Sequence, residues 1–173
     1  MFKLSEFGVV LAVAAVGVVA ATVDLRTRRV PNVLTFGAAS CGIGLAALGA
    51  SPVGLGASVA ALLLGLALML PGHVIGATGA GDVKLFAALA TFLGPGATAW
   101  AFLYAAIAGG VIALATAASR QSLRGTLMRT ALFVRTGGSN AAEIEVAGVD
   151  NRFAYAPAIA IGALVAAVGG LGF

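Results

Sequence analysis

The sequence predicts an all-α integral membrane protein with six transmembrane helices. Hydrophobic residues make up 61% of its 173 residues and charged residues only 9%, which is far from the composition of soluble globular domains. The apolar residues also form separate runs, most of them long enough at about 1.5 Å per residue to cross a hydrocarbon core of about 30 Å. Finally, the basic residues cluster in alternate connections between these runs. We therefore expect one polytopic membrane domain over residues 1–173.

The runs are bounded by charges, proline and glycine. The first is followed at once by Arg26, Arg28 and Arg29, a stop-transfer pattern that argues against a cleavable signal peptide. The six expected helices cover about 4–23, 33–50, 53–70, 82–93, 97–118 and 153–172.

Charge counting predicts the orientation. If both termini lie outside, the connections at 24–32, 71–84 and 119–152 face the cytoplasm and hold nine of the ten Lys and Arg residues, all except Lys3. This agrees with the positive-inside rule, which also explains these cations without nucleic-acid binding. The same topology places Asp24 and Asp82 at the cytoplasmic boundary of the bilayer.

The fourth helix is unusually short. From Asp82 to the break at 94–96 it spans only about 18 Å, too little to cross the membrane, so one of its ends is expected below the membrane surface. Non-helical backbone at that depth must be surrounded by protein or by a water-filled cavity. The glycine-rich loop at 76–81 is the candidate, because glycine allows another backbone to approach closely.

Asp24 and Asp82 are two of six acidic residues, and both border apolar runs, where an ionisable group is costly and indicates function. Each also has a structural interpretation: Asp82 as a helix N-cap, and Asp24 as a partner for nearby arginines. Pro31 and Asn32 are typical of a turn, with Asn32 capping the next helix.

Considered together, these segments carry more information. The sequence from Asp24 to Asn32, followed by Gly79-Ala80-Gly81-Asp82-Val83-Lys84, resembles the type IV prepilin peptidases, which are GxGD aspartyl proteases. The similarity is greatest to the short peptidases of tight-adherence (Flp) pilus systems, with archaeal preflagellin peptidases as relatives. The segment 153–162 resembles the family's last helix, except that Ala154 stands where the family often has proline.

The resemblance implies a single membrane peptidase domain of the prokaryotic inner membrane, with its active site facing the cytoplasm. Asp24 and Asp82 match the catalytic aspartates, and the implied reaction removes the leader peptide of a prepilin or pseudopilin. Gly79, Gly81, Pro31 and Asn32 are then supporting or substrate-binding candidates. Lys84 does not face Asp82 on a helix and is expected to extend to the surface, although the family has a lysine there and a supporting role stays open.

Two carboxyls suit peptide hydrolysis, because one takes a proton from water while the other, protonated, polarises the carbonyl. Asp24 lies at a helix C-terminus and Asp82 at an N-terminus, so the helix dipoles favour Asp82 as the ionised base by about 0.3–1 kcal/mol. The pair is expected to titrate as a unit.

No cofactor or metal is expected, since Cys41 is the single cysteine and cannot complete a zinc site. Cys41 is expected to be a buried thiol in the second helix. The zinc-binding insertion and the N-methyltransferase activity of many prepilin peptidases are therefore not expected here. Arginines interleaved with leucines at 120–135 suggest an amphipathic interfacial helix or a solvated loop within the cytoplasmic segment 119–152. The oligomeric state is open.

The alternative class is non-enzymatic: a transporter that uses the aspartates as a proton or cation site, or a scaffold of a secretion machine. Intramembrane carboxylates and broken helices also suit transporters. No inverted repeat is evident, and the aspartates are expected near one face of the membrane instead of its midplane.

Overall fold

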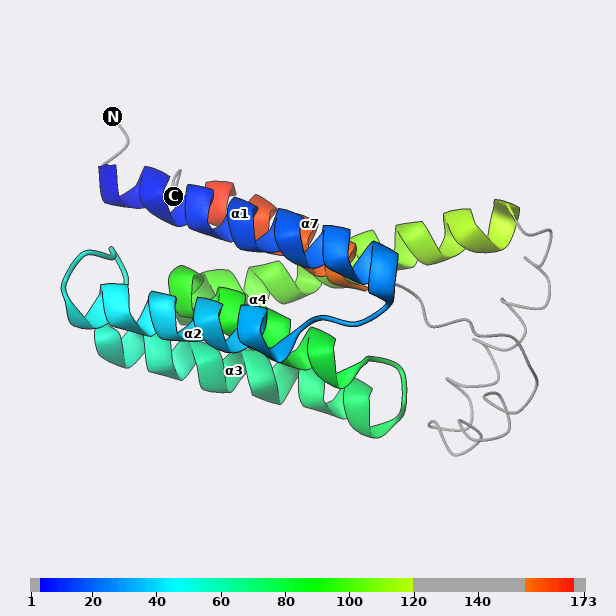
Figure 1. Cartoon of the computed structure of the whole chain (residues 1–173), viewed down its shortest axis with the longest axis horizontal. Coiled ribbons are helices and arrows are strands. Elements are labelled where there is room, and N and C mark those ends of the chain that lie inside the picture. The colour runs from blue at the N-terminus through cyan, green and yellow to red at the C-terminus, as the bar shows by residue number, and fades with distance from the viewer. Residues whose placement is uncertain (1–3, 120–154, 170–173) are drawn as a thin grey trace.

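The structure is a computed structural model that describes residues 4–119 and 155–169. Within these ranges every regular element is a helix, which confirms the all-α class. The helices lie side by side along the long axis of the molecule (Figure 1). Their bounds are Leu4–Thr27 (α1), Asn32–Ala47 (α2), Leu55–Val74 (α3), Ala80–Ser119 (α4) and Ala156–Gly169 (α7).

Three of these elements, α1, α3 and α4, are long and apolar enough to cross a membrane. The other two, α2 and α7, are apolar but shorter. The count of six transmembrane helices, and the placement of both termini outside, stay predictions. The segment 120–152, with its expected amphipathic helix, lies outside the described residues.

The long element α4 is folded back on itself at Gly94. Gly94 has φ 76° and ψ 169°, a conformation that is essentially restricted to glycine. The rings of Phe86 and Phe102 are 6.0 Å apart, whereas sixteen residues along a straight helix would separate them by about 24 Å. Figure 1 shows the chain after Gly94 running back toward the end where α4 begins. The expected short helix and its break at 94–96 are therefore present, as the first of two helical arms.

We expect Gly94→Ala to lower the thermal unfolding midpoint of the protein in detergent. A side chain in this region of φ and ψ costs about 1–3 kcal/mol. Gly96→Ala is the matched control two residues away, because a Cβ at Gly96 would meet nothing within 4 Å. Equal midpoints for the two variants would contradict the hairpin geometry.

Small residues bring the helices into close contact, as is typical of membrane proteins. A Cβ on Gly65 of α3 would lie 3.0 Å from the Cα of Ala87 in α4, and one on Gly17 of α1 would lie 2.9 Å from the Cβ of Ala160 in α7. The Ser58 hydroxyl donates a buried hydrogen bond of 2.9 Å to the Thr91 carbonyl, which links α3 to α4. Accordingly, α7 packs against both α4 and α1, whereas α1 touches α2 only slightly.

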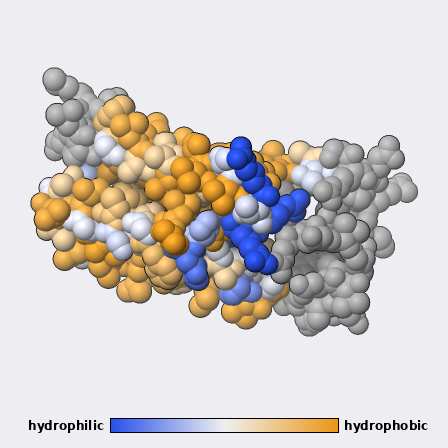
Figure 2. All heavy atoms as spheres, viewed as in Figure 1, coloured by the Kyte–Doolittle hydropathy of each residue, from blue (hydrophilic) through white to orange (hydrophobic). Residues whose placement is uncertain are grey.

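The polar residues gather at one end of this apolar bundle. Figure 2 shows a hydrophilic cluster near the end of α1. Arg26 lies in the last turn of α1, Arg28 and Arg29 directly follow this helix, and all three are exposed. Lys84 bonds to Asn32, the first residue of α2. All the Lys and Arg side chains that the structure describes thus lie at the end of the bundle that also holds the aspartates.

Candidate active site

Asp24 is held by two helices. It lies in the last turn of α1, and only 5% of its surface is exposed. Its Oδ2 accepts a hydrogen bond of 3.2 Å from the backbone N–H of Ala156, the first residue of α7. Arg28 interacts with the Asp24 carboxylate electrostatically. The start of α7, 132 residues later in the chain, therefore orients the Asp24 side chain in the last turn of α1.

Asp82 is held within the first turn of α4. Its exposed fraction is 9%, and its Oδ2 accepts a hydrogen bond of 3.1 Å from the N–H of Gly79. The Gly79 carbonyl accepts the first helical bond, from Val83, so Gly79 is the N-cap and Asp82 the third helical residue. Asp82 is thus not the N-cap itself, and its bond to Gly79 is one half of a capping box.

The two aspartates belong to one cluster. A Cβ on Gly81 would lie 3.3 Å from the Cβ of Val30, so the segment that follows Asp24 passes directly beside Asp82. The two carboxyls interact electrostatically. Among the described residues, each carboxyl accepts one backbone hydrogen bond, Asp24 from Ala156 and Asp82 from Gly79.

A comparison with models of known protein families identifies the family of this chain. The model of the type IV leader peptidase family matches residues 11–114, more than half of the chain and a stretch that contains both aspartates. The chain belongs to the type IV leader peptidase family. No curated protein and no solved structure matches it. Membership in this peptidase family agrees with a membrane environment and with pilin-type substrates.

The structure removes the reason for assigning different roles to the two aspartates from helix dipoles. That assignment assumed that Asp24 lies at a helix C-terminus and Asp82 at an N-terminus. Although Asp24 ends α1, its carboxylate accepts an N–H at the N-terminus of α7, just as Asp82 does at the N-terminus of α4. Both carboxyls therefore lie at the favourable end of a helix dipole. The assignment of Asp82 as base stays a prediction, but without that support.

Lys84 and Asn32 connect the starts of two helices near the aspartates. The Lys84 Nζ donates a hydrogen bond of 3.0 Å to the Asn32 Oδ1 and lies 5.7 Å from the centre of the Phe36 ring. Asn32 is the first residue of α2, and Pro31 is its N-cap without a side-chain bond. The expected capping role of Asn32 is therefore wrong: its side chain binds Lys84 instead, which gives Lys84 a specific contact with α2.

The glycine-rich loop is shorter and more exposed than expected. Only 75–79 lie outside the helices, since α4 already begins at Ala80. Gly76 has φ 76°, and 75–77 and Gly79 are exposed. The loop is therefore not enclosed by protein, and the water-filled cavity around it stays a prediction. Gly81, already inside α4, makes the expected close approach to another segment, at Val30.

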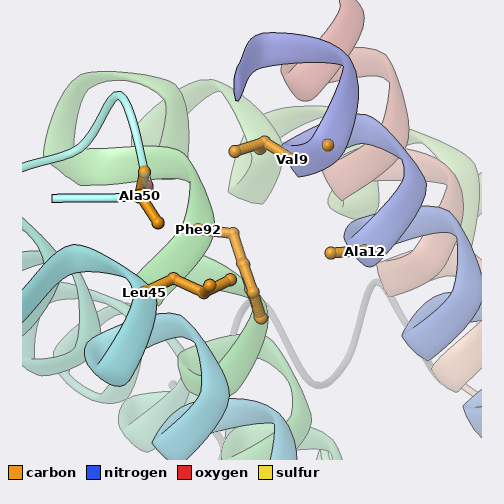
Figure 3. A pocket seen from close by; sticks show the side chains of 7 residues that line it. Val9, Ala12, Leu45, Ala50 and Phe92 are labelled. Atoms are coloured by element: carbon orange, nitrogen blue, oxygen red, sulfur yellow. The ribbon is translucent and has the colours of Figure 1, made fainter. Parts of the chain in front are cut away.

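A cavity of about 190 Å³ lies at the opposite end of the bundle. Figure 3 shows side chains from α1, α2 and α4 around it, with Phe92 between Leu45 and Ala12. Its walls come from the first turns of α1, the α2–α3 connection and the end of the first arm of α4. It is thus separate from the aspartates. Among the residues that the structure describes, no cluster of His, Cys, Asp and Glu could hold a metal ion.

Two site residues were not identified from the sequence. Ala156 contributes only its backbone N–H, which no side-chain pattern reveals. Tyr155, the residue before Ala156, is half-buried, and its hydroxyl donates a hydrogen bond of 3.4 Å to the Ala105 carbonyl. The similarity of 153–162 to the family's last helix was a usable signal, but it did not indicate contact with either aspartate.

Proposed function

We propose that the chain is a membrane aspartyl endopeptidase that removes the leader peptide from prepilin or pseudopilin substrates. Asp24 and Asp82 are the catalytic pair. The observation that carries the proposal is their arrangement: two buried carboxyls that interact electrostatically, each tied through one oxygen to a backbone N–H.

This arrangement suits hydrolysis assisted by a general acid and a general base. One carboxylate takes a proton from water as its oxygen attacks the scissile carbonyl carbon, and the other carboxyl, protonated, donates to the carbonyl oxygen. When the C–N bond breaks, the carboxyl that took the proton from water passes it to the leaving nitrogen, and the other carboxylate regains its proton from the oxygen as the carbonyl forms again. Two neighbouring carboxylates that repel each other disfavour double ionisation, so the pair readily holds the one proton that the mechanism needs.

The cytoplasmic membrane face is the proposed location of the reaction. Arg26, Arg28, Arg29 and Lys84 lie at the aspartate end of the bundle, and such clusters are typical of cytoplasmic ends. A prepilin-like substrate has a short basic leader, a glycine before the scissile bond and then an apolar helix. With that helix in the bilayer, its scissile bond lies at the level of Asp24 and Asp82. Pro31, Asn32, Gly79, Gly81 and Lys84 support this site.

Co-expression with a candidate prepilin tests the proposal. We expect the wild-type chain to shorten the prepilin by its leader, and N-terminal sequencing to place the cut after the leader's last glycine. The new amino terminus should be unmethylated by mass spectrometry. A panel of prepilins left intact by the well-expressed protein would contradict the proposal and favour a transporter or scaffold.

A further inference from the structure

The first turn of α7 contacts the Asp24 carboxylate and the second arm of α4. The Ala156 N–H donates to the Asp24 carboxylate, and this bond is buried. The preceding residue, Tyr155, is the N-cap of α7, because its carbonyl accepts the helical bond from Ile159 at 3.1 Å. The start of α7 thus holds one of the two carboxyls that the proposed reaction requires.

The Tyr155 ring lies against a glycine on the second arm of α4. A Cβ on Gly109 would lie 2.5 Å from the Cε2 of Tyr155 and 3.1 Å from its hydroxyl oxygen. One helical turn earlier, the Ala105 carbonyl accepts a hydrogen bond of 3.4 Å from that hydroxyl. The ring therefore fits along α4 only because residue 109 has no side chain. Since Tyr155 is the N-cap of α7, this contact joins the start of α7 to the second arm of α4.

We propose that Tyr155 and Ala156 form a positioning element of the active site. The Tyr155 ring, seated on Gly109, fixes the start of α7, and the Ala156 N–H at that start fixes the orientation of Asp24 relative to Asp82. The inference rests on the proposed catalytic role of the aspartates, and it explains how the Asp24 carboxyl is held in its orientation toward Asp82. Neither residue exchanges a proton with the substrate.

A pair of adjacent glycines provides the main test. Gly109→Ala displaces the Tyr155 ring, whereas a Cβ on Gly110 would meet nothing within 4 Å. Because a displacement of about 1 Å can cost about a hundredfold in rate, we expect Gly109→Ala to lower kcat about 10- to 100-fold with KM nearly unchanged. Gly110→Ala should keep wild-type kcat. Wild-type kcat in Gly109→Ala, or equal losses in both variants, would overturn the inference.

A double-mutant cycle tests whether Gly109→Ala lowers kcat by displacing the Tyr155 ring. In a Tyr155→Ala background the ring is absent, so adding Gly109→Ala should lower kcat no further. Tyr155→Phe keeps the ring and should retain kcat within about threefold, given that the hydroxyl contact is long. Additive losses from Gly109→Ala and Tyr155→Ala would contradict the proposal.

Ala156 offers a test that leaves Gly109 untouched, in case Gly109→Ala fails to fold. Ala156 is the first helical residue, a position that tolerates proline because its N–H has no helical partner. Ala156→Pro removes the N–H that binds Asp24, while Ala156→Gly retains it. We expect kcat to fall about 10- to 100-fold in the proline variant only, the range for losing a hydrogen bond to a charged group. Equal kcat in the two variants would refute the role of this N–H.

Failure of this inference is distinguishable from failure of the proposed function. If the wild type cleaves no prepilin, or if either Asp24→Asn or Asp82→Asn retains full cleavage, the catalytic assignment itself is wrong. If the aspartate variants are inactive while Gly109→Ala and Ala156→Pro match the wild type, only the positioning role is wrong.

Discussion

We expect Asp24→Asn and Asp82→Asn each to reduce the rate of leader removal by about a hundredfold to ten-thousandfold. An amide can neither accept the proton of the attacking water nor supply one, and acid–base catalysis by a positioned side chain contributes about 10²–10⁴ in rate. The measurement is a time course of prepilin cleavage by purified protein. Because the two carboxyls act as a unit, the double variant should be little slower than either single one.

The fold should survive these exchanges. The oxygen of an asparagine side chain can still accept the N–H of Ala156 at position 24 or of Gly79 at position 82. We therefore expect unfolding midpoints close to wild type, and uncleaved prepilin that still binds the variants. Glu6→Gln is the matched control, since Glu6 belongs to the same helix as Asp24 but to its opposite end. Full cleavage by Asp24→Asn or Asp82→Asn would falsify the catalytic assignment.

We also expect Gly162→Ala to destabilise the protein and to slow prepilin cleavage. A Cβ at this position of α7 would lie 2.6 Å from the Ala101 oxygen and 2.7 Å from the Ala105 Cα. Both are backbone atoms, so α7 must move away from α4. Overpacking of this kind costs about 1–3 kcal/mol, a decrease of about 2–12 °C in the unfolding midpoint on the soluble-protein scale.

The same movement should affect catalysis, because α7 begins with the Ala156 N–H that holds Asp24. Thermal unfolding and cleavage rates of the purified variant measure the two effects. Gly169→Ala is the control in the same helix, because a Cβ there would meet nothing within 4 Å. If Gly162→Ala matched Gly169→Ala in both measurements, the close packing of α7 on α4 would be wrong.

Much of the fold follows from local sequence. Apolar runs of membrane-spanning length predicted the helices, and the glycine and proline at 94–96 predicted the break in α4, because Gly94 adopts a conformation closed to other residues. The motif around Asp82 predicted a loop leading into a helix. The details of caps and burial were less predictable: Asn32 binds Lys84 across 52 residues instead of capping α2, and Cys41, expected to be buried in its helix, is exposed. Both outcomes depend on which faces of the helices meet.

The site divides in the same way. The sequence by itself determined that Asp24 and Asp82 are costly carboxyls at the ends of apolar helices, because composition and charge pattern are local properties, and the motifs around them indicated a leader peptidase. Only the tertiary structure decided that α7 lies between α1 and the returning arm of α4, and that its first N–H binds Asp24. The physical reason is that this contact joins a backbone N–H to a carboxylate 132 residues away, and it depends on helix packing at Gly109 and Gly162.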